Sequence, residues 1–249
     1  MSHMIKRCIC VLLLLCCQLA AMPYTLVIDA GHGGKDPGTQ SKTSKEKHIN
    51  LAVALAFGKL VEQNCPDVKV VYTRKTDVFV ELNERANIAN RAKADLFISI
   101  HTNSTPAKVG PQGTETYTLG MHCAAENLAV ARRENSVITL EKGYEQKYEG
   151  FDPNSSESYI IFELMQDKNM ERSVKLAGLV QKHFRNSSKR VDRGVHQAGF
   201  LVLRATSMPS VLIELGYINN PSEEAYLKSS AGVNSLAKSI YNAFVAYRK

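Results

Sequence analysis

The sequence predicts an α/β fold, a single domain with a mostly parallel twisted sheet and helices on both faces. Segments with the composition of strands alternate with segments whose apolar residues recur at helical spacing. The strand segments are near-continuous apolar runs, which is typical of parallel strands buried on both faces. A length of 249 residues with 44% hydrophobic residues suits one domain with one sizeable core.

The first half of the predicted domain supplies three strands and two helices. We expect strands at 24–30, 68–73 and 95–100, and helices at 49–63 and 82–93. The first helix is predicted because Ile49, Val53 and Leu60 fall on one helical face.

The second half supplies the remaining elements. We expect a helix at 173–184, strands at 200–204 and 211–215, and mostly helix over 222–248. Asn220 is placed to cap this last helical segment, with Pro221 at its first position and Glu223 at its third.

Residues 1–21 have the pattern of a secretory signal peptide. Lys6 and Arg7 precede the apolar run 9–15, and small residues follow at 18–21. We therefore expect export to the periplasm or cell envelope, with residues 22–249 as the mature domain. A retained anchor, or lipidation of Cys16 or Cys17, is the less favoured alternative.

Composition excludes some partners and leaves others open. The formal net charge of +7 favours contact with an anionic polymer, although ordinary solubility explains it as well. No stripe of Arg and Lys with interleaved aromatic residues indicates nucleic acid. Cys65 and Cys123 remain after the leader, as one disulfide or as two buried thiols.

Three residues have the types and positions of a catalytic metal site. His32 and His101 each follow an apolar strand, and Glu46 precedes the first predicted helix. Sites in such sheets lie beyond the carboxyl ends of the strands, so these side chains can meet. Two imidazoles and a carboxylate leave a fourth zinc position open for water. A phosphate-binding loop at Gly31–Gly34 is disfavoured, since the usual Gly-Lys-Ser/Thr ending is absent.

Glu214 lies near the end of the apolar run 211–215. A glutamate there is costly to bury without a partner. Beside a zinc-bound water it can take a proton and later deliver it to a leaving amine. The residues alone therefore predict a zinc hydrolase.

The chain resembles the zinc-dependent N-acetylmuramoyl-L-alanine amidases of bacterial cell walls, the type 3 amidase family. The matching segments run in order through most of the mature chain: Val27–Gly34, Glu46–Lys47 and Asn50, Thr73–Arg74 with Asp77, Leu82 and Arg85, Ala89–Asn90, Ser99–Asn103, Gly113–Glu115, Val202–Arg204 and Pro209–Asn220. The resemblance implies that His32, Glu46 and His101 bind Zn2+ and that Glu214 is the catalytic acid and base. It also implies that the scissile amide joins N-acetylmuramic acid to L-alanine of peptidoglycan.

Four further polar residues have open roles. Asn103 and Arg204 are our candidates for substrate contacts, although a structural ion pair fits Arg204 equally well. Asp29 and Asn103 are also placed to orient metal ligands through hydrogen bonds. We expect Arg85 to be structural.

The segment 121–170 is longer than a compact amidase core needs. Some division-associated members of the family it resembles cover the zinc with a helix from this region and need an activator protein. We therefore hypothesise that residues 135–170 form a lid, with Glu141 or Glu145 approaching the metal. A wall of the substrate groove, or a plain surface insertion, is an equal alternative.

Two other functions remain open from the sequence. A zinc peptidase acting on stem peptides can use the same ligands. A wall-binding module without catalysis can keep the zinc, but it has no need of Glu214 as a buried proton shuttle. The oligomeric state is left open.

Overall fold

The computed structural model describes residues 23–122, 124–164 and 168–249. Its strands form one six-stranded sheet in the order β2-β1-β3-β6-β4-β5. The strands are β1 (Tyr24–Ala30), β2 (Val68–Tyr72), β3 (Leu96–Asn103), β4 (Thr114–Leu119), β5 (Asp192–Ala198) and β6 (Ser210–Tyr217). All neighbouring pairs are parallel except β4 with β6. The predicted α/β fold with a mostly parallel sheet is confirmed.

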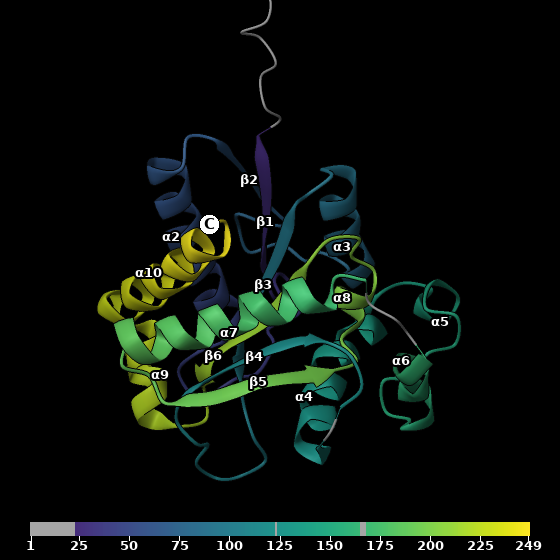
Figure 1. Cartoon of the computed structure of the whole chain (residues 1–249). Coiled ribbons are helices and arrows are strands. Elements are labelled where there is room, and N and C mark those ends of the chain that lie inside the picture. The colour runs from purple at the N-terminus through teal and green to yellow at the C-terminus, as the bar shows by residue number, and fades with distance from the viewer. Residues whose placement is uncertain (1–22, 123, 165–167) are drawn as a thin grey trace, which may run out of the picture.

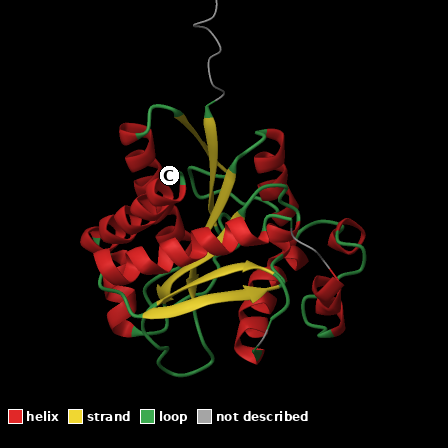
Figure 2. Cartoon of the chain, in the orientation of Figure 1, coloured by secondary structure: helices red, strands yellow, loops and turns green. Residues whose placement is uncertain are grey.

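Helices cover both faces of this sheet (Figures 1 and 2). One face carries the three longest helices, α2 (Glu46–Asn64), α7 (Met170–Ser187) and α10 (Ser230–Tyr247). The other carries α3 (Leu82–Arg91), α4 (Ala125–Asn135) and the short α8 (Leu201–Arg204). The remaining helices are η1 (Ser136–Leu140), α5 (Tyr144–Lys147), η2 (Glu157–Ile160), α6 (Ile161–Leu164) and α9 (Pro221–Lys228).

The alternation of strand side chains divides the apolar interior into two cores. In β1, Leu26 and Ile28 face the α2, α7 and α10 layer, whereas Val27 faces the opposite layer. All three side chains are fully buried. This burial on both faces explains why β1 is a continuous apolar run in the sequence.

The predicted strand at 200–204 is wrong, and two real strands were not predicted. Residues 201–204 form α8, and Phe200 to Leu203 are apolar because they are buried in the second core. A short apolar run does not distinguish a strand from a helix by its periodicity. β4 contains three threonines, and β5 is an edge strand of mostly half-buried residues, so neither shows an apolar run.

Within the long segment 121–170, residues 124–162 are an integral part of the second core. After α4 it continues through η1, α5, η2 and α6. Tyr148, Phe151, Tyr159 and Phe162 are buried, and the rings of Phe151 and Tyr159 lie 5.1 Å apart. The aromatic residues therefore anchor this segment to the domain, which argues against a plain surface insertion.

Three further features compared with the predictions are the cap at Asn220, the cysteines with the predicted signal peptide, and the hydropathy of the helices. Asn220 caps α9 by accepting hydrogen bonds from the backbone N–H groups of Ser222 and Glu223, as predicted. Cys65 is a buried thiol outside any disulfide, while Cys123 and the predicted signal peptide lie outside the described residues. Among the helices of the described ranges, none has the length and hydropathy needed to cross a membrane.

Candidate metal centre and active site

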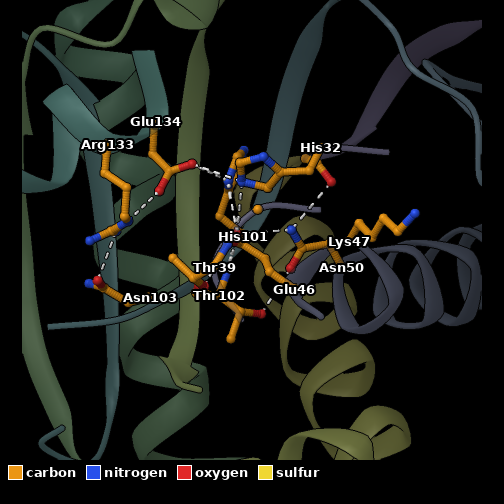
Figure 3. A network of polar contacts seen from close by, with 12 residues as sticks. His32, Thr39, Glu46, Lys47, Asn50, His101, Thr102, Asn103, Arg133 and Glu134 are labelled. Atoms are coloured by element: carbon orange, nitrogen blue, oxygen red, sulfur yellow. Dashed lines mark hydrogen bonds and ion pairs between the residues drawn. The ribbon is translucent and has the colours of Figure 1, made fainter. Parts of the chain in front are cut away.

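The three predicted metal ligands meet at one point beyond the carboxyl ends of β1 and β3. Oε1 of Glu46, at the start of α2, lies 3.2 Å from Nε2 of His32 and 3.2 Å from Nδ1 of His101. All three side chains are buried. Figure 3 shows the two imidazoles and the carboxylate turned toward one another.

A fourth side chain completes this cluster, and the sequence analysis did not identify it. Oε2 of Glu134, in the last turn of α4, lies 3.0 Å from Nε2 of His32 and 2.9 Å from Nδ1 of His101 (Figure 3). The four residues form a cluster of possible metal ligands within the described part of the chain. No signal in the sequence singled it out, because Glu134 is one of several charged residues in α4.

The prediction that Glu141 or Glu145 approaches the metal is wrong. The carboxylate of Glu141 accepts hydrogen bonds from the backbone N–H of Leu82, at 2.9 Å, and from the hydroxyl of Tyr148, at 3.0 Å. Glu145 is exposed in α5. The carboxylate that does reach the two histidines belongs to Glu134, one residue before the predicted lid of 135–170. The element that covers the cluster is therefore α4.

The donor atoms of the cluster fit a tetrahedral metal ion. Nε2 of His32, Nδ1 of His101 and Oε2 of Glu134 are buried and have no hydrogen-bond partner, although Oε2 of Glu134 lies 3.0 and 2.9 Å from the two nitrogen atoms. All four donor atoms of the cluster lie within 4.8 Å of one another. Ligand atoms about 2.0–2.1 Å from a tetrahedral zinc ion lie about 3.3 Å from one another. The observed separations of 2.9–3.2 Å are close to that value. Two nitrogen and two carboxylate donors are a ligand set that zinc accepts.

Neighbouring groups fix the orientation of the ligands. Nδ1 of His32 lies 2.7 Å from a carboxylate oxygen of Asp36, which leaves Nε2 facing the cluster. Oε1 of Glu46 accepts a 2.8 Å hydrogen bond from the backbone N–H of Thr102. Oε2 of Glu46 accepts two from Thr39, at 2.8 and 2.9 Å. The side chains of His32 and Glu46 are therefore positioned by hydrogen bonds within the fold.

The glycine-rich loop after β1 allows this close packing. His32 has a φ of +61°, a left-handed conformation that is uncommon for a residue other than glycine. Arg85 supports it by donating a 2.9 Å hydrogen bond to the carbonyl of His32. A Cβ on Gly31 would lie 2.3 Å from the ring of His101, and one on Gly38 would lie 2.6 Å from Oε2 of Glu46. Side chains at these two glycines would displace the ligands.

Asp29 is buried in β1 and contacts Arg85, Thr73 and Ser99, not the side chains of the cluster. Its carboxylate pairs with Arg85 at 2.7 Å and accepts hydrogen bonds from the hydroxyls of Thr73, at 2.6 Å, and Ser99, at 2.7 Å. Burial alone would raise the pKa of Asp29, but the charge of Arg85 and these hydrogen bonds hold it below its usual value. The expected structural role of Arg85 is confirmed, whereas orientation of His32 comes from Asp36, which was not predicted.

Glu214 lies beside the cluster at the end of β6. It is opposite His101 in the β3–β6 register, it is buried, and neither of its carboxyl oxygens has a hydrogen-bond partner. The nearest cation is the guanidinium of Arg133, 3.7 Å from Oε1. Burial, followed by the negative charge of Glu134, raises the pKa of Glu214 well above its usual value despite Arg133. A carboxyl group with such a pKa is suited to exchanging protons near neutral pH.

The last turn of α4 also contacts the proposed substrate residue Asn103. Arg133 donates to Oδ1 of Asn103 and to the carbonyl of Ser104, both at 2.9 Å, and its Nε donates to Glu134 (Figure 3). Arg204 lies elsewhere: it is 3.9 Å from Glu149 and lines a separate cavity of about 210 Å³. The structure thus brings Asn103, and not Arg204, to the metal cluster.

Comparison with known proteins identifies the family. The family profile described as N-acetylmuramoyl-L-alanine amidase matches residues 26–246. The amidase AmiA of Escherichia coli K12 is 31% identical over 89% of this chain and 75% of its own length. AmiC of Escherichia coli O6:H1 is 30% identical over 90% of this chain, which spans 53% of that relative.

A solved structure agrees with the sequence comparison. The crystal structure of an N-acetylmuramoyl-L-alanine amidase from Clostridium difficile 630 superposes with a TM-score of 0.68 at 29% identity. The match covers 92% of this chain and 98% of the other. The chain therefore belongs to the N-acetylmuramoyl-L-alanine amidase family, and it is a hydrolase of the amide between N-acetylmuramic acid and L-alanine in peptidoglycan.

Proposed function

We propose that this amidase is zinc-dependent, with His32, Glu46 and His101 as the permanent ligands and Glu134 as a fourth, removable one. The observation that supports this most strongly is the cluster of four buried donor atoms within 4.8 Å of one another, three of which have no hydrogen-bond partner. Zinc, when bound, polarises the scissile carbonyl and lowers the pKa of a bound water to about 7.

In this proposal Glu214 moves the proton. Its carboxylate takes a proton from the attacking water and delivers it to the amine of L-alanine as the amide breaks. Burial beside His101 without a hydrogen-bond partner leaves both oxygens available for this transfer.

The described arrangement is then a closed form of the enzyme. Glu134 takes the position that water or the substrate carbonyl needs, and Arg133 holds Asn103 and faces Glu214. Hydrolysis therefore requires α4 to leave the site. Asn103 becomes free to contact the substrate in the open form, whereas the contacts of Arg204 give no reason to include it.

Displacement of α4 calls for a second binding event, because its contacts with the cluster are charged and buried. We propose that a partner protein or the polymeric substrate supplies it. We also propose export to the periplasm or cell envelope, from the signal-peptide pattern and from the location of peptidoglycan.

The test uses purified peptidoglycan and mass spectrometry. The zinc-loaded Glu134→Ala protein is expected to release peptides with N-terminal L-alanine faster than the unmodified chain, and adding Glu214→Gln is expected to abolish release. Glu145→Ala, an exposed glutamate of α5 outside the cluster, is the matched control.

Two results contradict the proposal. Shortened peptides that remain attached to muramic acid indicate a peptidase. Full activity of the Glu134→Ala/Glu214→Gln protein removes Glu214 from the mechanism.

A further inference from the structure

A cavity lined by both apolar and charged residues lies next to the metal cluster, between the sheet and α4. Its volume is about 600 Å³, and its walls include Asn103, Glu115, Tyr217 and Arg193 from the sheet and Arg133 from α4. Arg133 also contacts Asn103 and Glu214, so the cavity adjoins the site at Arg133 and Asn103. The role proposed for the metal cluster does not use Arg193.

Glu115 organises the sheet side of this cavity. It is buried in β4, and Oε2 accepts hydrogen bonds from Asn103, at 3.1 Å, and from the hydroxyl of Tyr117, at 2.8 Å. Oε1 accepts from the hydroxyl of Tyr217, at 2.7 Å, and from Nε of Arg193, at 3.0 Å. Four donors share the negative charge of this carboxylate, which holds the guanidinium of Arg193 in place.

The two terminal amino groups of Arg193 are available to donate hydrogen bonds. Its Nε is engaged by Glu115 and Tyr217, but its two terminal amino groups have no acceptor within the described residues. The guanidinium lies over the ring of Tyr217, 5.4 Å from its centroid, and the side chain is 34% exposed. A planar guanidinium fixed along one edge presents its other donors in the geometry that a carboxylate accepts.

The position of this guanidinium relative to Glu214 indicates what it binds. Glu115 is directly opposite Glu214 in the antiparallel β4–β6 register. In the proposed function, Glu214 delivers a proton to the amine of the scissile amide. The peptide that carries this amine therefore starts beside Glu214 and can extend toward the neighbouring Glu115. The cavity beyond is therefore on the peptide side of the bond.

We propose that Arg193 binds a carboxylate of the stem peptide and makes the enzyme prefer substrates in which that carboxylate is free. This inference rests on the proposed function of the neighbouring site. Arg133 and Glu126, the charged residues that α4 contributes to the cavity, leave with that helix, whereas Arg193 and Glu115 belong to the sheet and remain.

The test compares two synthetic substrates in the Glu134→Ala background. One is N-acetylmuramoyl-L-alanyl-D-glutamate, and the other carries both carboxylates as amides. We expect the acid to be cleaved with a kcat/KM about 10- to 100-fold above that of the diamide, as for a charge-assisted hydrogen bond. Arg193→Gln is expected to reduce this ratio to near one, by slowing cleavage of the acid only. The two mono-amides identify which carboxylate is bound.

Two further variants guard against loss of folding as the cause. Arg193→Lys keeps the positive charge without the forked donors, and we expect an intermediate ratio. Arg185→Gln removes an exposed arginine that pairs with Asp192 outside the cavity, and we expect the full ratio. A ratio that Arg193→Gln leaves unchanged, or a wild-type ratio near one, overturns the proposal.

A binding measurement separates failure of this inference from failure of the proposed function. Titration calorimetry of free L-alanyl-D-glutamate and its diamide does not depend on hydrolysis. Tighter binding of the acid, lost in Arg193→Gln, supports the carboxylate site even if no protein cleaves either substrate. Equal binding of the two peptides by the Glu134→Ala protein overturns it even if the amidase activity is confirmed.

Discussion

The two sides of the metal cluster are held in different ways. On the sheet side, Glu46 has its own hydrogen bonds to Thr39 and Thr102, and His32 has its own partner in Asp36. On the α4 side, Glu134 contacts the two histidines and Arg133, its own helix neighbour. The sheet side is thus complete without α4, whereas α4 depends on the sheet side, so we interpret α4 as a removable cover on a preformed site.

The attachment of α4 shows which contacts must break for the cover to leave. Its buried apolar residues are Val130 and Ala131. The residue that follows the cover, Asn135, donates to the carbonyl of Gly199 at 2.7 Å and accepts from the N–H of Leu201 at 2.9 Å. These hydrogen bonds lie next to Glu134 and must loosen when the last turn moves, whereas the earlier turns of the helix have little apolar contact to keep them in place.

The largest effect is expected from removing the proton shuttle on the sheet side. Glu214→Gln, in the Glu134→Ala background, is expected to lower kcat by about 10²- to 10⁴-fold, since general acid and base catalysis contributes that much. The measurement is the rate of stem-peptide release, with zinc content as the control for an intact site. A fall in zinc content that parallels the fall in rate contradicts a role limited to the proton.

The next largest effect is expected from breaking the buried ion pair between Asp29 and Arg85, which supports the sheet side of the site. Asp29→Asn is expected to lower the free energy of unfolding by about 3 kcal/mol at neutral pH, because it leaves Arg85 buried without its counter-charge. The pKa of Asp29 is lowered in the folded state, so its contribution is present above its unfolded pKa and is lost as the pH falls.

Urea unfolding between pH 3 and 7 is the measurement. The variant should show a flatter loss of stability in acid than the unmodified chain. Asp67→Asn removes an exposed carboxylate that pairs with Arg248, and we expect it to leave the midpoint unchanged. Equal midpoints for the two variants would count against the buried pair as a support.

A smaller effect is expected from the cover itself. Glu134→Ala is expected to raise the basal hydrolysis rate by about 5- to 150-fold, the range of typical coupling between two states. Release of labelled peptide from peptidoglycan measures it, with Glu145→Ala as the control. A rate that is unchanged in Glu134→Ala would mean that α4 does not limit access.

The smallest effect is expected at the orienting groups. Asp36→Ala is expected to weaken zinc binding by about 10- to 100-fold, because His32 loses the partner that fixes its ring. Competition with a chelator measures the affinity. An unchanged affinity would show that the loop backbone alone positions His32.

The sequence predicted the sheet side better than the cover for a physical reason. His32, His101 and Glu214 stand at the ends of apolar strands, and parallel strands bring their carboxyl ends together. Glu134 is one charged residue in a helix with several, between Arg133 and Asn135, and nothing in its composition shows which face is buried. Asp36 likewise lies in a polar loop, where aspartate is common. The tertiary contacts, and not local pattern, select these residues.

Cobalt substitution tests the removable cover most directly. With Co2+ in place of zinc, the unmodified chain should give the visible spectrum of a site with four protein ligands, and azide should leave that spectrum unchanged. The Glu134→Ala protein should instead bind azide at the vacated position and shift its absorption. An equal azide response from both proteins would contradict the account, because the fourth position would then be open while α4 is in place.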